Sequence, residues 1–388
     1  MNASVRLPND GTGLLGEPYS RRNCPQATRD GQPAGRWIAL DESGWDGDQL
    51  HGMDRSRYLT IGSVAISDED AANLVDDLRR TTRVQAPELK FGTSFAKDGQ
   101  TQRRKALVAL LGPGGALEKR ASVYLLDKHY FIVGKLIDLF VEEQTYKQGL
   151  DIRNTGIARK MARDLVAEGP RALGPVLFDR LLAATVAFTS YKNRDQQISV
   201  DDFYNTVEEA WARSSRRNVT RLLGLLRTTR VEAHEYLTDA FGPDASLPAA
   251  LEPLIPGVAA VTANWSQRMG RVNILTDDQR ALTDYHLDNI RDEARGLGHP
   301  EFRYISQDVR LGELLRGKSS DHPSLQLADL VAGAGFAVAK RHDGYITPAG
   351  EELYSVIVPL IDPAGMLSHD EPGRVAQAGI PMPTPQPR

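Results

Sequence analysis

The chain has 388 residues, of which 41% are hydrophobic and 25% charged, with a formal net charge of −4 and a pI of about 6.1. These values are ordinary for a globular protein, and they exclude a surface that is basic throughout but not a local basic groove. The one cysteine, Cys24, excludes an internal disulfide and a cysteine-rich zinc site. Because there is no apolar run of membrane-spanning length and no apolar signal-peptide core, we expect a cytoplasmic protein without a membrane partner.

The first segment, residues 1–35, is rich in Gly, Pro, Asn and Arg and lacks a sustained period, which indicates a flexible arm. Residues 36–128 combine three strand-like runs (RWIAL, YLTIGSVAI, ASVYLL) with two helix-like ones (EDAANLVDDLRR, TQRRKALVALLG). Nearly every segment of residues 129–268 has the helical period. A strand-like run, RVNILTD, then opens residues 269–361, and a proline-rich tail follows at 362–388.

This order predicts an α/β protein with one sheet flanked by helices. Residues 36–128 and 269–361 supply the two parts of the sheet domain. The helical residues 129–268 are expected to be an insertion that forms its own small bundle.

Three of the predicted strands run into acidic residues. RWIAL meets Asp41 and Glu42, NILT meets Asp277 and Asp278, and YLL meets Asp127. Side chains alternate along a strand, so Asp41 and Glu42 cannot face the same side if the strand continues. Carboxylates at the ends of neighbouring strands converge at one edge of a sheet. The alternative is a set of polar strand ends followed by turns, and Asp127 either joins the site or merely ends its strand.

An aspartate also occurs inside an otherwise apolar helix, SLQLADLVAGAG. Asp329 has poor helix propensity at this mid-helix position, and a buried carboxylate is costly unless it is paired or binds a metal. Gln326 one turn earlier, with Ala332 and Gly333 one turn later, gives a stripe of residues that lets the helix approach the sheet closely. The alternative is a buried aspartate bonded to a strand backbone or to an arginine.

The short run PELKF contains a further candidate, Glu88, with Lys90 two residues later. On a strand these two side chains share one face. The alternative is a solvated charged pair on an edge strand.

Clustered carboxylates repel one another and stay ionised when a divalent cation holds them. Hard oxygen ligands of this kind suit Mg²⁺ or Mn²⁺, and two such ions can activate water and stabilise the leaving oxygen of a phosphodiester. The sequence contains no H-x-x-x-H pair, no G-x-S-x-G motif and no G-x-x-x-x-G-K-[ST] phosphate loop.

The order of LDESG, ELKF, a strand ending in Asp277 and the helix HPSLQLADLVAGAG resembles the DUF3800 family. The resemblance covers residues 36–136 and 270–341. It implies a ribonuclease H-like (retroviral integrase superfamily) fold and a hydrolase activity that is itself inferred for the family.

The resemblance implies roles for five residues. Asp41 and Asp329 match metal ligands of the first strand and the last helix, Glu88 and Asp277 match two further acids, and Lys90 would act electrostatically near phosphate. Glu42 is expected to support Asp41. The run NILTDDQ departs from the family pattern, which leaves either Asp277 or Asp278 as the ligand, and Asp321 in SSDHPS is interpreted as a helix N-cap.

A local positive stripe, RSSRRNVTRLLGLLRTTR, occupies residues 213–230. Arg213, Arg217 and Arg221 have the spacing of one helical face, with Leu222, Leu225 and Leu226 toward a bundle, and such arginines suit phosphate contacts. The alternative is a solvated face paired to acids such as Glu208, Glu209 and Glu232.

These observations predict a Mg²⁺- or Mn²⁺-dependent phosphodiester hydrolase, a nuclease, with RNA or DNA as its partner. One alternative is a nucleotide or small phosphate-ester hydrolase on the same fold. The other is a non-catalytic nucleic-acid-binding or scaffold protein of a defence or mobile-element system. The sequence leaves the oligomeric state and the metal identity undetermined.

Overall fold

A computed structural model describes residues 35–47, 49–52, 55–153, 155–190, 198–241, 251–278, 282–294, 309–362 and 364–368. The expected arm (apart from Gly35) and residues 369–388 of the expected tail lie outside the described residues. So does Cys24.

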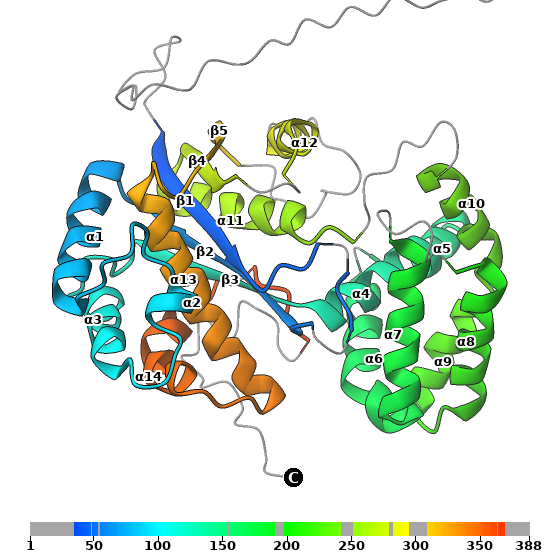
Figure 1. Cartoon of the computed structure of the whole chain (residues 1–388). Helices are drawn as coiled ribbons and strands as arrows, with labels where there is room; N and C mark the ends of the chain where they lie inside the picture. Colours follow the sequence, from blue (N-terminus) through cyan, green and yellow to red (C-terminus); the bar gives the residue numbers. More distant parts are fainter. Residues whose placement is uncertain are drawn as a thin grey trace, which may run out of the picture. The chain divides into compact units, whose positions relative to one another are not determined.

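The described chain is α/β, with a five-stranded mixed sheet in the order β3-β2-β1-β4-β5 (Figure 1). The strands are β1 (Arg36–Ser43), β2 (Tyr58–Val64), β3 (Ala121–Asp127), β4 (Val272–Asp277) and β5 (Leu311–Gly317). β2 is antiparallel to β1 and to β3, whereas β4 is parallel to β1 and to β5. The four strand-like runs of the sequence are therefore confirmed, and β5 is an additional strand.

One face of the sheet is covered by α13 (Pro323–Ala339), which packs on all of the first four strands. Around it lie α1 (Asp68–Thr82), α3 (Thr101–Leu111) and α14 (Pro348–Ile357), together with the single turn α2 (Phe91–Ser94). Their buried apolar side chains form one core with those of this face, among them Ala39, Val123 and Leu275. Burial of such apolar surface is the main force that joins the layers.

The opposite face is covered by α11 (Leu254–Met269), which contacts β1 to β4. Gly257 of α11 lies against Ile61 and Tyr124, because a Cβ at this position would be 2.6 Å from the Ile61 side chain. α12 (Asp284–Ala294) then packs between α11 and β5. The expected insertion thus includes a helix that belongs to the sheet layers.

The other helices between β3 and β4 pack mainly on one another. They are α4 (Lys128–Leu136), the π-helix η1 (Ile137–Glu142), α5 (Glu143–Lys147), α6 (Ile157–Leu173), α7 (Pro175–Thr189), α8 (Val200–Arg213), α9 (Arg217–Leu226) and α10 (Arg230–Phe241). Their apolar side chains form a single cluster with Leu40, Ile61 and Ile274 of the sheet. The core of these helices is therefore continuous with that of the sheet, in contrast to the expected separate bundle.

The beginning of the expected tail is bound along β3. Asp362 N–H donates to Val123 O over 2.7 Å, Met366 N–H donates to Leu125 O over 2.9 Å, and Asp127 N–H donates to Met366 O over 2.9 Å. Asp362 and residues 364–366 thus cover the outer side of β3, after the 3-10 helices η4 (Lys340–Asp343) and η5 (Val358–Leu360). Within the described part of the chain, no helix has the length and apolar character needed to cross a bilayer.

Candidate functional site

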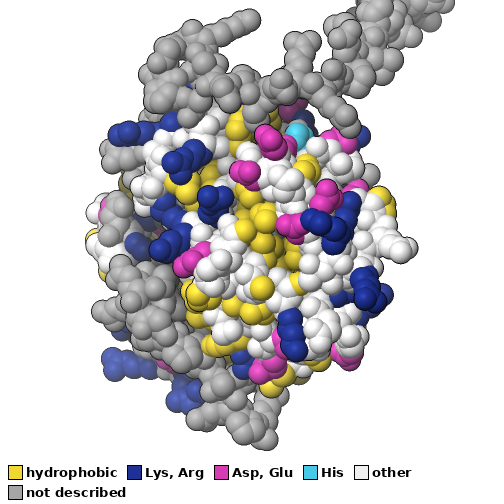
Figure 2. Space-filling view, turned by 90° about the vertical axis from the view of Figure 1, so that its left-hand side faces the viewer, with side chains coloured by type: hydrophobic (Ala, Val, Ile, Leu, Met, Phe, Trp, Pro, Cys, Tyr) yellow, Lys and Arg dark blue, Asp and Glu magenta, His cyan; other side chains and the backbone are white. Residues whose placement is uncertain are grey.

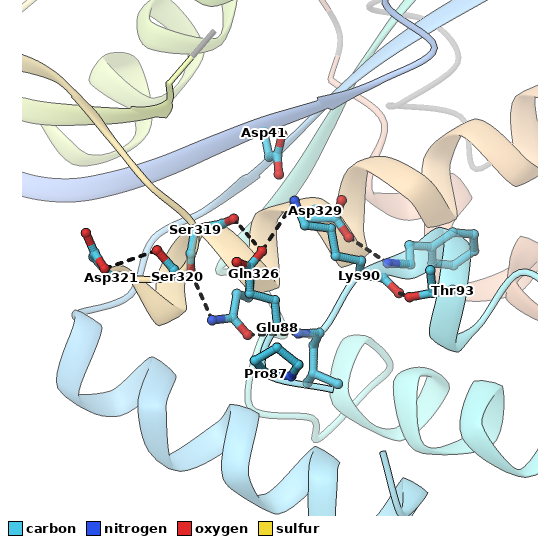
Figure 3. Close-up of polar contacts among 12 residues, drawn as sticks. Asp41, Pro87, Glu88, Lys90, Thr93, Ser319, Ser320, Asp321, Gln326 and Asp329 are labelled. Carbon is cyan, nitrogen blue, oxygen red and sulfur yellow. Dashed lines mark hydrogen bonds and ion pairs between the residues drawn. The ribbon is translucent and has the colours of Figure 1, made fainter. Parts of the chain in front are cut away.

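Asp41 and Glu42 lie inside β1, whose ladder with β2 continues through the pairs Asp41–Gly62 and Glu42–Ile61. Ala39 packs in the core under α13, whereas Leu40 packs in the core on the α11 side. Because side chains alternate along the strand, Asp41 points to the α13 side and Glu42 to the opposite side. Asp41 is only 5% exposed, and Figure 3 shows its carboxyl directed from the strand toward Lys90 and Asp329.

Helix α13 brings Asp329 to Asp41 because its backbone lies directly on β2. A Cβ at Gly62, which is opposite Asp41, would be 2.2 Å from Ala332 N and 2.4 Å from Ala328 O. The Thr60 hydroxyl donates to Ala332 O over 2.8 Å. The small residues of α13 therefore allow the close approach that the sequence predicts.

Two polar side chains of α13 bind the chain segment that carries Glu88 and Lys90. Phe91 N–H donates to Asp329 Oδ2 over 2.6 Å, and Leu89 N–H donates to Gln326 Oε1 over 3.0 Å. Gln326 Nε2 in turn donates to Ser319 O over 2.9 Å. The segment is irregular and leads into α2, so the expected strand is wrong, and side-chain contacts hold it instead of a ladder.

Glu88 and Lys90 nevertheless meet, as Figure 3 shows. Lys90 Nζ is 3.6 Å from Glu88 Oε2, which also accepts a hydrogen bond of 2.9 Å from Ser319 Oγ. Partial burial lowers the pKa of Lys90, but the nearby carboxylates of Asp329, Asp41, Glu88 and Asp277 reverse this and raise it above its usual range. Asp41 and Asp277 directly follow the paired residues Leu40 and Thr276 of neighbouring strands, and all four acids are near enough for their charges to act on Lys90. We call Asp41, Glu88, Asp277, Asp329 and Lys90 the carboxylate site.

Two acids of the carboxylate site, Asp41 and Asp329, have charges that their neighbours do not fully balance. Burial, followed by the charges of Glu42, Asp329 and Asp277, raises the pKa of Asp41 well above its usual range. Asp41 Oδ1 accepts a hydrogen bond from Glu42 N–H over 2.7 Å, which only partly offsets this effect. Burial also raises the pKa of Asp329, although Phe91 N–H and Lys90 oppose the effect. Such shifts mark carboxyl groups that are buried and lie near other acids.

On the other side of β1, Glu42 faces an acid that sequence reasoning missed. Burial and the charge of Asp277 raise the pKa of Glu42 to about 8, and Asp329 and Glu252 add to this. Glu252, at the start of the α11 region, is 4% exposed and accepts hydrogen bonds from Trp45 Nε1 over 3.0 Å and from Leu254 N–H over 3.2 Å. Trp45 directly follows the DESG motif, but no local pattern links it to a residue 207 positions away.

Two other candidate acids are not part of the carboxylate site. Asp278 is exposed, and its Oδ1 is 4.0 Å from Arg316 Nη1. Asp127 caps α4 by accepting from His129 N–H, and it forms two hydrogen bonds with Arg57, of 3.0 and 2.7 Å. β3 is separated from β1 by β2, so Asp127 ends its strand as a structural anchor.

The N-cap role expected for Asp321 is wrong, because α13 begins at Pro323 and its N-cap residue is His322. Asp68 of α1 satisfies this end of the helix instead, accepting from Ser324 N–H over 3.2 Å and from Ser324 Oγ over 2.5 Å. It also contacts His322 Nδ1 over 2.6 Å. Asp321 is exposed beside Ser320, which donates to it over 3.1 Å.

The arginine stripe does not form one helical face. α8 ends at Arg213 and α9 begins at Arg217, so the three residues between them interrupt the expected helix. Arg213 pairs with Glu209 over 3.3 Å, which is the alternative considered from the sequence. Arg217 and Arg221 are both exposed on α9.

The leucines of the stripe differ in part from the expectation. Leu222 and Leu226 are buried against the other helices as expected. Leu225 is 38% exposed, however, and Leu223 takes the buried position instead.

Among the described residues, no group of three or more His, Cys, Asp or Glu side chains has the arrangement needed to hold a metal ion. The donor chemistry of the carboxylate site nevertheless suits a hard divalent cation, since its donors are carboxylate oxygens whose charges are only partly balanced. Lys90 is the cation that now lies among them. Comparison with family models, curated proteins and solved structures finds no match to this chain.

Proposed function

We propose that the protein is a Mg²⁺- or Mn²⁺-dependent phosphodiester hydrolase that acts on nucleic acid. The supporting observation is the convergence of Asp41, Glu88, Asp277 and Asp329 around Lys90. These acids come from two strands, a loop and a helix, and burial beside other acids raises the pKa of two of them, Asp41 and Asp329. Burial without full compensation is typical of groups that await a ligand rather than of anchors for a fold.

In this proposal Asp41, Asp277 and Asp329 would hold the cation, with Glu88 as a further ligand. A bound Mg²⁺ or Mn²⁺ supplies an activated water and balances the negative charge that develops on a phosphodiester. Lys90 would lie beside the phosphate and attract it electrostatically, because its side chain is 45% exposed at the surface of the site. The side chains of Gln326 and Asp329 accept hydrogen bonds from the backbone N–H groups of residues 89 and 91, and this fixes Glu88 and Lys90 in place.

The fold agrees with the same proposal. A ribonuclease H-like domain of the DUF3800 type would have a mixed sheet flanked by helices, with a helical stretch between its two parts. The mixed five-stranded sheet and the helices between β3 and β4 support this interpretation. Fold likeness alone does not give the activity, so the carboxylate site carries the proposal.

The first test is calorimetric titration of Mn²⁺ into the wild type, Asp41→Asn/Asp329→Asn and the control Asp278→Asn. We expect binding to the wild type and the control but not to the double variant, because the control removes an exposed charge next to the site. Cleavage of RNA, DNA and hybrid substrates with either metal should follow the same order. Wild-type protein that binds no metal and leaves all three substrates intact contradicts the proposal.

Two further measurements distinguish the proposed function from its two alternatives. Hydrolysis of mononucleotides without hydrolysis of polymers would indicate a small phosphate-ester hydrolase on the same site. Unchanged cellular function of the double variant would instead indicate a binding or scaffold protein.

A further inference from the structure

A cavity of about 510 Å³ opens between the C-terminal end of α1 and the start of α3. Arg83 and Arg103 line it with polar neighbours that include Thr81, Gln100 and Gln102, and its lining contains no acid. Figure 2 looks onto the side of the protein that carries α1 and α3, and shows Lys and Arg side chains gathered at several places on it. Two arginines and no acid among the lining residues make a local positive site in a chain whose net charge is negative.

The two arginines differ from their neighbours in their partners. Arg80 pairs with Asp77, and the buried Arg104 pairs with Glu352 over 2.9 Å. Arg103 uses Nη1 to donate to Ser94 O over 3.3 Å, and within the described ranges no carboxylate forms an ion pair with it or with Arg83. Their charges are therefore available to an anion, and the planar guanidinium group matches the oxygens of a phosphate.

Helix α2 connects this cavity to the carboxylate site. α2 begins at Phe91, directly after Lys90, and Phe91 N–H donates to Asp329. At its end, Arg103 binds Ser94 O, and Gln100 Nε2 donates to Thr93 O over 3.1 Å. A helix of four residues is about 6 Å long, so an extended strand that crosses α2 can contact the site and the cavity together.

We propose that the Arg83–Arg103 cavity binds a backbone phosphate of the nucleic acid whose reacting phosphodiester lies at the carboxylate site, an inference that rests on the proposed function. Contacts of this kind fix the register of a strand without reading its sequence. A small ester with a single phosphate at the carboxylate site has no second phosphate to place in the cavity.

The test measures the affinity for fluorescein-labelled 12-nucleotide single strands, DNA and RNA, by fluorescence anisotropy in EDTA at several salt concentrations. Arg83→Asn removes a charge and suits the left-handed backbone of this residue, whose φ is 54°. Arg103→Gln removes the second charge, and Arg103→Lys keeps it. The control is Lys105→Gln. Lys105 lies on the same helix and is exposed, and its charge lowers the pKa of Glu352, which does not line the cavity.

We expect Arg83→Asn and Arg103→Gln each to weaken binding roughly five- to tenfold at low salt and to reduce the salt slope by about 0.7. Lys105→Gln should stay within about twofold of the wild type, because it removes no charge from the cavity, and Arg103→Lys should keep the wild-type salt slope, because it keeps the charge. Cleavage of a small ester, bis(p-nitrophenyl) phosphate, with Mn²⁺ should be the same in all variants.

Wild-type affinity in Arg83→Asn and Arg103→Gln overturns the inference, as does an equal loss in Lys105→Gln. If the wild type still cleaves polymers in that case, only the cavity assignment fails and the proposed function stands. A wild type that neither binds nor cleaves any of the polymers contradicts both.

Discussion

Asp41 and Asp127 make an informative comparison because the sequence presents them in the same way. Each follows an apolar run in a strand, and the two strands, β1 and β3, run in the same direction on either side of β2. Both side chains are almost fully buried, with exposed fractions of 5% and 1%. Position and burial therefore do not distinguish a site residue from an anchor.

Their partners do distinguish them. Burial alone would raise the pKa of Asp127, but the two hydrogen bonds from Arg57 and the Arg57 charge hold it below its usual range. Ser368 Oγ donates to the same carboxylate over 3.0 Å. Asp41 has acids as neighbours instead, and its pKa is raised. A buried aspartate with a dedicated arginine stabilises the fold, whereas one surrounded by acids is available for a ligand.

The largest expected effect is that of Asp127→Ala. It leaves the Arg57 guanidinium without its main partner and removes the cap of α4, so the free energy of unfolding should fall by about 3–5 kcal/mol. Urea denaturation measures this. The matched control is Asp343→Ala, since Asp343 Oδ1 contacts the same guanidinium over 3.2 Å but is 28% exposed. Equal losses in the two variants would show that Asp127 is not the anchor.

Gly62→Ala tests what holds Asp329 near Asp41. The new methyl group would meet the α13 backbone at 2.2–2.4 Å, so the helix must move away from β2. We expect a loss of about 2–4 kcal/mol in the free energy of unfolding, together with weaker Mn²⁺ binding.

Gly134→Ala is the control for this substitution, because Gly134 lies in α4 with no atom near its added Cβ. Alanine there should stabilise the protein by up to about 1 kcal/mol through helix propensity. Thermal unfolding compares the two, and a Gly62→Ala protein as stable as the wild type contradicts the close approach.

Asp41→Asn should have the opposite sign to Asp127→Ala. It removes a buried charge that other acids destabilise, so the metal-free protein at pH 8 should be stabilised by about 1 kcal/mol. Asp278→Asn, an exposed neighbour of the site, should change stability by less than about 0.5 kcal/mol. Calorimetric melting in EDTA measures both, and a clear loss of stability in Asp41→Asn would indicate that its charge is compensated after all.

The sequence predicts much of what surrounds Asp41 because the relevant patterns are local. Alternation along RWIALDES separates Asp41 from Glu42, and the small residues around Asp329 permit contact with the sheet. β5 escaped prediction because the three leucines of LGELLRG do not alternate with polar residues and only Leu314 is buried. A short strand at the edge of a sheet needs little apolar character.

The contacts that separate Asp41 from Asp127 could not be read from the sequence, because they join distant residues. Arg57 lies 70 positions from Asp127, and Asp68 caps a helix more than 250 positions away. The break of the arginine stripe at residues 214–216 is similar, since the spacing of Arg213, Arg217 and Arg221 suits one helix as well as two. Local periodicity predicts elements, whereas charge compensation depends on the tertiary fold.

The smallest expected effect is a pH dependence. Glu42 has an ordinary pKa of 4.5 and a pKa of about 8 in the folded protein, so between these values the folded state binds more protons than the unfolded state. The free energy of unfolding should therefore fall as pH rises from 4.5 to 8, and be insensitive to this group below that window. In Glu42→Gln the fall should be smaller by about 0.5–1 kcal/mol, since solvent reaches part of the Glu42 side chain and screens its charge. Urea denaturation in EDTA at several pH values measures this difference.

Identical pH profiles for Glu42→Gln and the wild type would place the proton on another acid of the group. A wild-type stability that rises with pH would mean that the charge of Glu42 is compensated, as that of Asp127 is.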